Sequence, residues 1–167
     1  LTRSSAASDV YKRQVASYFL SCNRGKKIVF ANLKNERERV RSLMDTVDVV
    51  IENFKPGAFD RLLGPVKPDL IVCSISGYGQ EGPRRDEPAF DLTMQARSGI
   101  MSVTGEEDGP PAKVGVAWID VMTGMNAVSS ILACLLRRNR GGGGARIDIS
   151  LWDTAVSSLV NQGHNAL

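Results

Sequence analysis

Asp120 is the residue whose surroundings most directly suggest chemistry. It lies in the largely apolar segment 118–127, and no lysine or arginine stands within six residues of it on either side. An ionised carboxylate in such a segment is costly to desolvate unless hydrogen bonds or a helix N-terminus stabilise it. Helically spaced apolar residues begin at Met125, so Asp120 is expected just before the first turn of a helix predicted over 125–138. The local pattern leaves two interpretations open: a carboxylate that reacts or binds, or an acid that only caps the helix.

Other kinds of catalytic and metal chemistry find little support in the sequence. His164 is the only histidine, which excludes mechanisms that need two histidines and argues against Ser-His or Cys-His catalysis. The three cysteines, Cys22, Cys73 and Cys134, are far apart and lie in apolar segments. They are expected to be reduced core thiols of an intracellular, cytoplasmic protein, with neither a disulfide framework nor a metal site.

The composition is that of a soluble domain. The chain has 167 residues, of which 43% are hydrophobic and 23% charged, enough for one domain with a sizeable core. No run of residues is expected to approach the length of a membrane span. The net charge of +3 is modest and the basic residues are scattered, so we expect no nucleic-acid or membrane partner.

Apolar runs and breakers predict alternating strands and helices. Residues 1–14 have no sustained period and are interpreted as an adaptor-derived, non-native segment, which leaves 15–167 as the domain. A helix capped by Asn35 is expected to carry the apolar stripe 40–47. The predicted strands are 28–30, 49–51, 70–75 and 147–151, and the further predicted helices are 58–63, 90–101, 125–138 and 152–160. This order predicts an α/β fold with a parallel sheet whose strands are buried on both faces.

Two further features have plain structural interpretations. Residues 141–144 are four consecutive glycines, expected to be a helix C-cap and flexible turn rather than a phosphate cradle. Trp118 and Trp152 lie in apolar patterns and are expected in the core. The chain stops inside a predicted helix with no closing element, so it is interpreted as part of a longer protein, truncated at both ends.

Several ordered segments resemble the class III CoA-transferases, the CaiB/BaiF family. The most specific are Glu-Asn-Phe-Lys-Pro-Gly at 52–57, Ser-Ile-Ser-Gly-Tyr-Gly-Gln at 74–80, and the Asp120 segment with its Thr-Gly at 123–124. Weaker matches lie at 21–27, 88–91, 95–99 and 104–111. Together the segments cover the chain from about residue 17 to its end, and members of the family are more than twice as long.

The resemblance implies a Rossmann-like parallel sheet with flanking helices, part of a larger two-domain protein whose two subunits interlock as a homodimer. It also implies that Asp120 is the nucleophile, which forms an acyl anhydride and then an aspartyl-CoA thioester before an acceptor acid takes the CoA. The partners would be an acyl-CoA and a carboxylic acid, with no permanently bound cofactor. The acyl group and the acceptor are left open, because the family's substrate-determining segments lie largely beyond Leu167.

The resemblance further implies a set of CoA contacts, which follow strand ends where open α/β sheets bind ligands. They are Ala31, Asn32, Leu33, Lys34, Asn53, Phe54, Lys55, Arg61, Pro88, Ala89, Phe90 and Asp91. The cations among them have an equally good interpretation as solvated surface charges.

Two rival functions remain. The 2-methylacyl-CoA racemases of the same superfamily share the aspartate but pair it with a histidine, and Phe90 stands at that position here. Proton transfer on opposite faces of a carbon needs two groups, so Phe90 argues against a racemase. The second rival is a non-catalytic nucleotide-binding domain in which Asp120 only caps a helix.

Overall fold

The computed structural model describes residues 17–165 and divides at Asn32 into two units, each considered by itself. In the first unit, α1 (Ser17–Asn23) is followed by irregular chain. The predicted strand at 28–30 is wrong: these three apolar residues are exposed and form no strand. Strand propensity depends on packing against a sheet, and the described part of this unit contains none. The interpretation of residues 1–14 as an adaptor lies outside the described residues.

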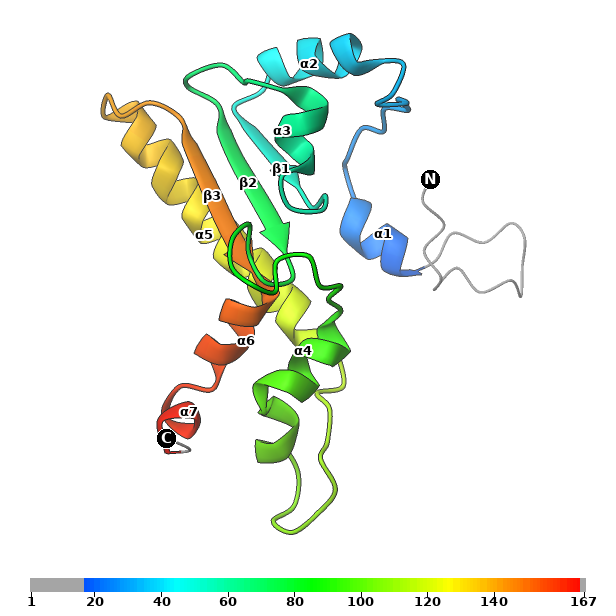
Figure 1. Ribbon diagram of the computed structural model, residues 1–167, viewed down its shortest axis with the longest axis vertical. Coiled ribbons are helices and arrows are strands. Elements are labelled where there is room, and N and C mark those ends of the chain that lie inside the picture. Colours follow the sequence, from blue (N-terminus) through cyan, green and yellow to red (C-terminus); the bar gives the residue numbers. More distant parts are fainter. Residues whose placement is uncertain (1–16, 166–167) are drawn as a thin grey trace, which may run out of the picture. The chain divides into compact units, whose positions relative to one another are not determined.

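The second unit is built on a parallel sheet (Figure 1). Its three strands are in the order β1-β2-β3, and both pairs are parallel, which confirms the predicted α/β fold. The elements are α2 (Arg37–Asp45), β1 (Val49–Glu52), α3 (Ala58–Leu63), β2 (Ile71–Ser76), α4 (Asp91–Ser98), the 3-10 helix η1 (Ile100–Val103), α5 (Trp118–Asn139), β3 (Ala145–Ser150), α6 (Leu151–Ser158) and α7 (Asn161–Asn165).

Helices α2 and α3 cover one face of the sheet. Met44 of α2 and Phe59 of α3 pack with Val72 of β2 in one apolar cluster. The predicted stripe of α2 is therefore confirmed at Val40 and Met44, whereas Leu43 in the helix and Val47 beyond it are exposed. The predicted cap is wrong, because the helix begins after Glu36 and no side chain caps it.

The opposite face is covered by α5, which packs along β2 and β3. At the carboxyl ends of these strands, a second apolar cluster joins α4, α5 and α6 through Met94, Ile119 and Ala155. Trp152 packs against this cluster, as predicted, whereas Trp118 is 37% exposed and does not lie in the core. The second cluster fixes the first turn of α5, where Asp120 lies.

Burial differs between the strands. β2 is central and almost wholly buried, as predicted. β1 is not buried on both faces: Ile51 is 60% exposed, since α5 packs on β2 and β3.

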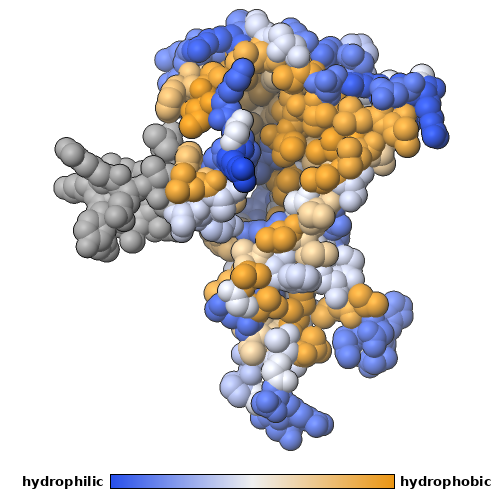
Figure 2. All heavy atoms as spheres, turned by 180° about the vertical axis from the view of Figure 1, so that it is seen from behind, coloured by the Kyte–Doolittle hydropathy of each residue, from blue (hydrophilic) through white to orange (hydrophobic). Residues whose placement is uncertain are grey.

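An apolar stripe runs along the outer side of α5. It comprises Val121, Met125, Val128, Leu132 and Leu136, spaced three or four residues apart and exposed. Figure 2 shows apolar side chains gathered over this helix. By length and composition α5 could cross a membrane, so the expectation that no run approaches that length is wrong. Since its other side packs on the sheet, α5 is a sheet-covering helix with one uncovered face.

The four-glycine turn after α5 is more constrained than predicted. Gly141 has a φ of +93° directly after the C-cap residue Arg140, as expected of a glycine that ends a helix. The N–H of Gly144 donates to the carbonyl of Pro68 at 2.9 Å. A Cβ on Gly144 would lie 2.3 Å from the carbonyl oxygen of Leu70. Close backbone approach, rather than flexibility, therefore explains this glycine.

Candidate active site

Asp120 lies inside the first turn of α5 and not before it. The helix begins at Trp118, seven residues earlier than predicted, and Asp120 is its third residue. Ala117 occupies the N-cap position and offers no side-chain hydrogen bond. The exposed N–H groups of this helix start must therefore find their acceptor elsewhere in the fold.

That acceptor is Asp91, the first residue of α4. Its Oδ1 accepts hydrogen bonds from the N–H of Ile119 at 2.7 Å and from the N–H of Asp120 at 3.2 Å. A carboxylate bound by first-turn N–H groups is favourable, because these groups carry the positive end of the helix dipole. Asp91 thus caps the helix that carries Asp120 from 29 residues away in the sequence.

Gln95, one turn further along α4, holds Asp91 in this position. Its Nε2 donates to Asp91 Oδ2 at 2.5 Å, and its Oε1 accepts from the N–H of Val114 at 2.8 Å. A longer contact joins the Nε2 to the carbonyl of Val116 at 3.4 Å. The side chain is only 1% exposed. Gln95 therefore ties α4 to the segment that leads into α5.

The pKa of Asp120 is raised above its usual value. Desolvation is the larger cause and the negative charge of Asp91 the smaller one. Both effects disfavour the charged form of the carboxyl group. Asp120 nevertheless keeps exposed surface. A more basic carboxylate is a better nucleophile once ionised, and an exposed one can be reached by a reacting carbonyl.

The loop after β2 packs directly against the start of α4. Gly77 lies so close to Ala89 that a Cβ on the glycine would be 2.3 Å from the Cβ of Ala89. The carbonyl of Gly77 also accepts from the N–H of Trp152 at 3.0 Å. Since Ala89 precedes Asp91 by two residues, this contact places the cap of α5 relative to the sheet.

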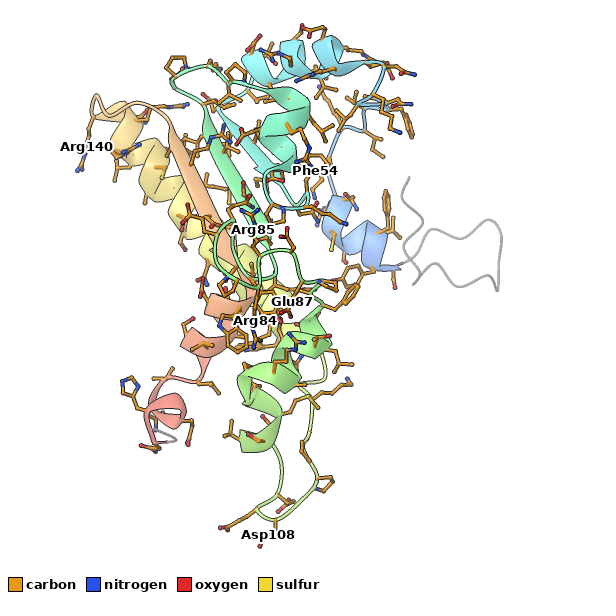
Figure 3. The ribbon with its side chains drawn as sticks, viewed as in Figure 1. Phe54, Arg84, Arg85, Glu87, Asp108 and Arg140 are labelled. Atoms are coloured by element: carbon orange, nitrogen blue, oxygen red, sulfur yellow. The ribbon has the colours of Figure 1, made fainter. Side chains whose placement is uncertain are left out.

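Charged side chains fix the rest of this loop. Arg97 of α4 donates to Tyr78 Oη at 2.5 Å and to Glu87 at 2.6 Å. Arg84 and Arg97 both stack near the ring of Tyr78, at 6.0 and 5.9 Å from its centre. Figure 3 shows Arg84, Arg85 and Glu87 gathered in this loop. The loop is thereby fastened to α4.

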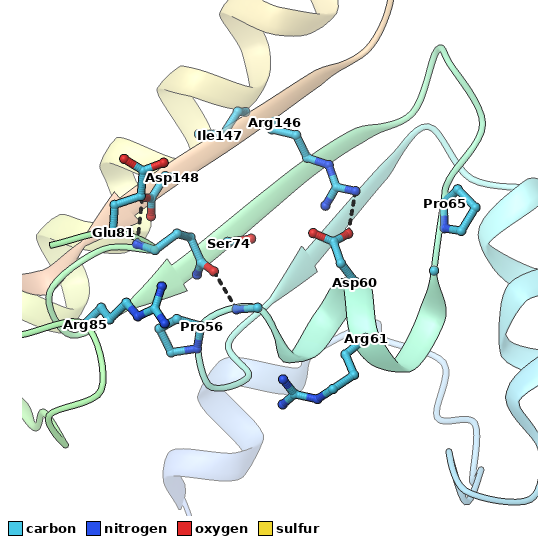
Figure 4. A pocket seen from close by; sticks show the side chains of 13 residues that line it. Pro56, Asp60, Arg61, Pro65, Ser74, Glu81, Arg85, Arg146, Ile147 and Asp148 are labelled. Atoms are coloured by element: carbon cyan, nitrogen blue, oxygen red, sulfur yellow. Dashed lines mark hydrogen bonds and ion pairs between the residues drawn. The ribbon is translucent and has the colours of Figure 1, made fainter.

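A cleft of about 880 Å³ lies beside α3, β2 and β3 (Figure 4). Its walls carry both charges, and Arg146 pairs with Asp60 at 2.7 Å. Gln80 crosses the cleft, since its Oε1 accepts from the N–H of Gly57 at 3.1 Å and its N–H donates to Asp148 at 2.8 Å. Asp120 is not among the residues that line this cleft. The cleft and the carboxylate are separate features of the described chain.

The first group of predicted CoA contacts divides between the two units. Ala31 and Asn32 end the first unit, and Leu33 and Lys34 begin the second. Leu33 packs against the cluster of α2 and α3, so its side chain has a structural role. Lys34 is exposed. The assignment of these four residues to CoA stays a prediction.

The second group gathers at the carboxyl end of β1. Asn53, Phe54 and Lys55 follow the strand directly and are exposed (Phe54 is labelled in Figure 3). The buried Glu52 shapes this turn, because its Oε2 accepts from the N–H of Phe54 at 2.7 Å. Arg61 of α3 lines the cleft. Their position at strand and helix ends fits the prediction without testing it.

The third group leads into α4. Pro88 and Phe90 are exposed, Phe90 by 72%. Ala89 packs against the cluster of α4, α5 and α6. Both oxygens of Asp91 already accept hydrogen bonds within the chain. Of the predicted CoA contacts, Asp91 is thus the one that the structure brings to Asp120, and it does so as a cap.

The family profile described as CoA-transferase family III matches residues 2–167. The chain belongs to this family. A succinate–glutarate CoA-transferase of Agrobacterium fabrum is 44% identical over 160 residues, and an acetyl-CoA:oxalate CoA-transferase of Acetobacter aceti is 42% identical over 151 residues. The crystal structure of a CaiB/BaiF family protein from Brucella suis has a TM-score of 0.85 at 42% identity.

The family III chain spans about 40% of the length of the relatives it matches. The matches cover 91% of the chain and 40% of the Agrobacterium protein, and 85% and 39% for the Acetobacter protein. For the Brucella structure the shares are 90% and 42%. The family match confirms the resemblance found in the sequence.

Two residues that position Asp91 and Asp120 were not predicted from the sequence. Gln95 belongs to a matching segment and was not singled out, although its spacing of four from Asp91 on a predicted helix is the signal of an Asp–Gln hydrogen bond. Gly77 gave no signal of its own, because its contact with Ala89 exists only in the folded chain.

Proposed function

We propose that the complete protein carrying this chain transfers CoA from an acyl-CoA to a carboxylic acid, with Asp120 as the covalent nucleophile. The observation that carries the proposal is the carboxylate in the first turn of α5, whose pKa is raised by desolvation and by the charge of Asp91 and which keeps exposed surface. Family III membership supports the same assignment.

The proposed reaction needs four exchanges at carbonyl carbons. A carboxylate oxygen of Asp120 attacks the thioester, the C–S bond breaks, and CoA thiolate leaves an acyl-aspartyl anhydride. The thiolate then attacks the aspartyl carbonyl and releases the donor acid, which leaves aspartyl-CoA. The acceptor carboxylate attacks this thioester and frees the thiolate again. Attack of the thiolate on the acceptor's carbonyl forms the new acyl-CoA and regenerates Asp120.

We propose that one or both acids are short dicarboxylic acids. The names of similar family III proteins mention succinate with glutarate, succinyl-CoA with mesaconate, and acetyl-CoA with oxalate. Each of these pairs includes a dicarboxylate, and the four relatives with those pairings are 39–44% identical to this chain over the aligned residues. Succinyl-CoA with glutarate, mesaconate or oxalate is therefore the first set of substrates to assay.

A racemase is the weaker alternative. It requires a second proton-transfer group opposite the aspartate, and Phe90, exposed at the start of α4, has no titratable proton. The complete protein is therefore expected to show no exchange of the α-proton of a 2-methylacyl-CoA in deuterated water.

We also propose that the complete protein is a homodimer with interlocked subunits. The apolar stripe of α5 supports a further covering element, because so long a row of apolar side chains is unfavourable in water. Light scattering of the purified complete protein would give twice the subunit mass.

Replacement of Asp120 tests the proposed function. Asp120→Ala and Asp120→Asn are expected to lower kcat by roughly 10³ or more, while the affinity for CoA stays within a few-fold of wild type. Circular dichroism would check that both variants fold. Turnover at the wild-type rate in either variant would refute the nucleophile assignment.

A further inference from the structure

We propose that Gln95 is a positioning residue for CoA transfer: through Asp91 it holds the first turn of α5, and with it Asp120, in the reactive place. The inference rests on the proposed function, since it concerns how that nucleophile is held. Nothing in the family match or in the names of the relatives assigns a role to Gln95.

The hydrogen bonds of Gln95 determine which atom of Asp91 faces which partner. Because the Nε2 donates to Asp91 Oδ2, the other oxygen, Oδ1, is directed to the N–H groups of Ile119 and Asp120. The Oε1 of Gln95 meanwhile accepts from the N–H of Val114. The amide of Gln95 is thus oriented from both ends, and it cannot rotate by 180° without placing donors against donors.

Because Gln95 is buried, the loss of any of its hydrogen-bond partners is costly. Gln95 is 1% exposed, so water cannot replace a lost partner. A buried donor or acceptor without a partner is costly, and more so beside a charge. Asp91 is half-buried, and within the described residues Gln95 is the side chain that hydrogen-bonds to it. The placement of the helix cap therefore depends on one glutamine.

The hydrogen bond between Gln95 and Asp91 can be tested by exchanging its donor and its acceptor. In Gln95→Glu, two carboxylates face each other and the bond is lost. In Asp91→Asn, the Oδ1 can still cap α5, but its Nδ2 then faces the Nε2 of Gln95. In the double variant, which combines both substitutions, the amide introduced at position 91 donates to the carboxylate introduced at position 95. That carboxylate still accepts from the N–H of Val114, so the bond returns with reversed polarity.

Expected results follow from this geometry. Each single variant is expected to lower kcat roughly 10- to 100-fold at pH 8, with a smaller change in the KM for acyl-CoA. The double variant is expected to recover about tenfold over the weaker single variant. In Gln95→Glu, kcat relative to wild type rises as the pH falls, because the carboxyl group introduced at position 95 can again donate to Asp91 once it is protonated.

The measurements use the complete protein, with thermal unfolding of every variant recorded beside its kinetics. Gln162→Glu makes the same chemical change on the exposed surface of α7 and is the matched control. Wild-type protein and Asp120→Ala are assayed in parallel, so that absence of CoA transfer in the wild type refutes the proposed function and not this inference.

Three outcomes would overturn the role of Gln95 while transfer by the wild type stands. One is a Gln95→Glu variant with the kcat of wild type across the pH range. Another is a double variant no faster than the weaker single variant. The third is a loss of kcat that follows the loss of folded protein in all three variants, since the pair would then act only in stability.

Discussion

The contact between Gly77 and Ala89 offers the sharpest test of how the fold places the site. Gly77→Ala would bring two Cβ atoms to 2.3 Å, whereas carbon atoms in contact lie about 3.5–4.0 Å apart. The loop after β2 and the segment entering α4 must therefore separate by roughly 1 Å or more. Neither partner is a flexible side chain, so the backbone has to move.

The displacement should lower both the stability of the fold and the rate of catalysis. Overpacking of this kind typically costs about 1–3 kcal/mol in the free energy of unfolding. Asp91 lies two residues beyond Ala89 and caps α5, so the displacement passes to Asp120. A misplacement of about 1 Å at a reacting group can lower the rate roughly 100-fold. We expect kcat of the complete protein to fall between tenfold and a hundredfold, on the order of that estimate.

An exchange of the two residues provides the control. In Gly77→Ala with Ala89→Gly the methyl group moves from one chain segment to the other, and most of the activity should return. Gly143→Ala is a matched glycine substitution, because its Cβ would lie 3.6 Å from the nearest atom. Steady-state CoA transfer by the three variants and wild type is the assay. Equal kcat in Gly77→Ala and wild type, or no recovery in the double variant, would refute the reasoning.

Three further predictions follow from the described contacts. Burial and Asp91 raise the pKa of Asp120, so the rate of acylation should fall as the pH drops through that raised pKa. Asp91→Asn should move this acidic limb of the pH–rate profile to lower pH, and an unmoved limb would contradict the electrostatic coupling between the two residues. Gly144→Ala should lower the free energy of unfolding by about 2–4 kcal/mol, and with it the thermal midpoint, because the new Cβ meets the backbone of Leu70. Gly143→Ala should change the midpoint little, and similar midpoints for both variants would contradict close backbone approach as the reason for Gly144. If the exposed Arg61 of α3 contacts a CoA phosphate, Arg61→Ala should weaken CoA binding roughly tenfold, as measured by calorimetry. Unchanged affinity would show that Arg61 is an ordinary surface charge.

Much of the sheet could be predicted from the sequence because its signals are local. The helix predicted at 58–63 has those bounds in the structure, since the Lys-Pro-Gly turn at 55–57 places Gly57 at its N-cap position. The run at 70–75 is apolar except for Ser74 and contains most of the buried central strand. The alternation of apolar and polar residues at 147–151 predicted β3, although Leu151 begins the next helix. In each case neighbouring residues determine the outcome.

The errors occur where partners distant in the sequence determine the structure. The start of α5 was predicted seven residues late, because no Ser, Thr, Asp or Asn directly precedes Trp118 and the cap comes from Asp91. Residues 28–30 had strand propensity but no sheet within the described part of their unit. Likewise, the isolation of Asp120 among apolar residues left its role open, and the family resemblance supplied the prediction that it is the nucleophile. The hydrogen bonds from its helix start to Asp91 join segments 28 and 29 residues apart and gave no local signal.

Mass mapping of the covalent intermediate tests the central claim most directly. The complete protein is incubated with a succinyl-CoA donor and no acceptor acid, quenched in acid, digested and analysed by tandem mass spectrometry. The account predicts that a CoA thioester or an acyl group is attached to the peptide that contains Asp120, that it is located on that side chain, and that it disappears when an acceptor acid is added before the quench. An adduct on another carboxylate, or rapid CoA transfer with no adduct on Asp120 at any time of quenching, would contradict it.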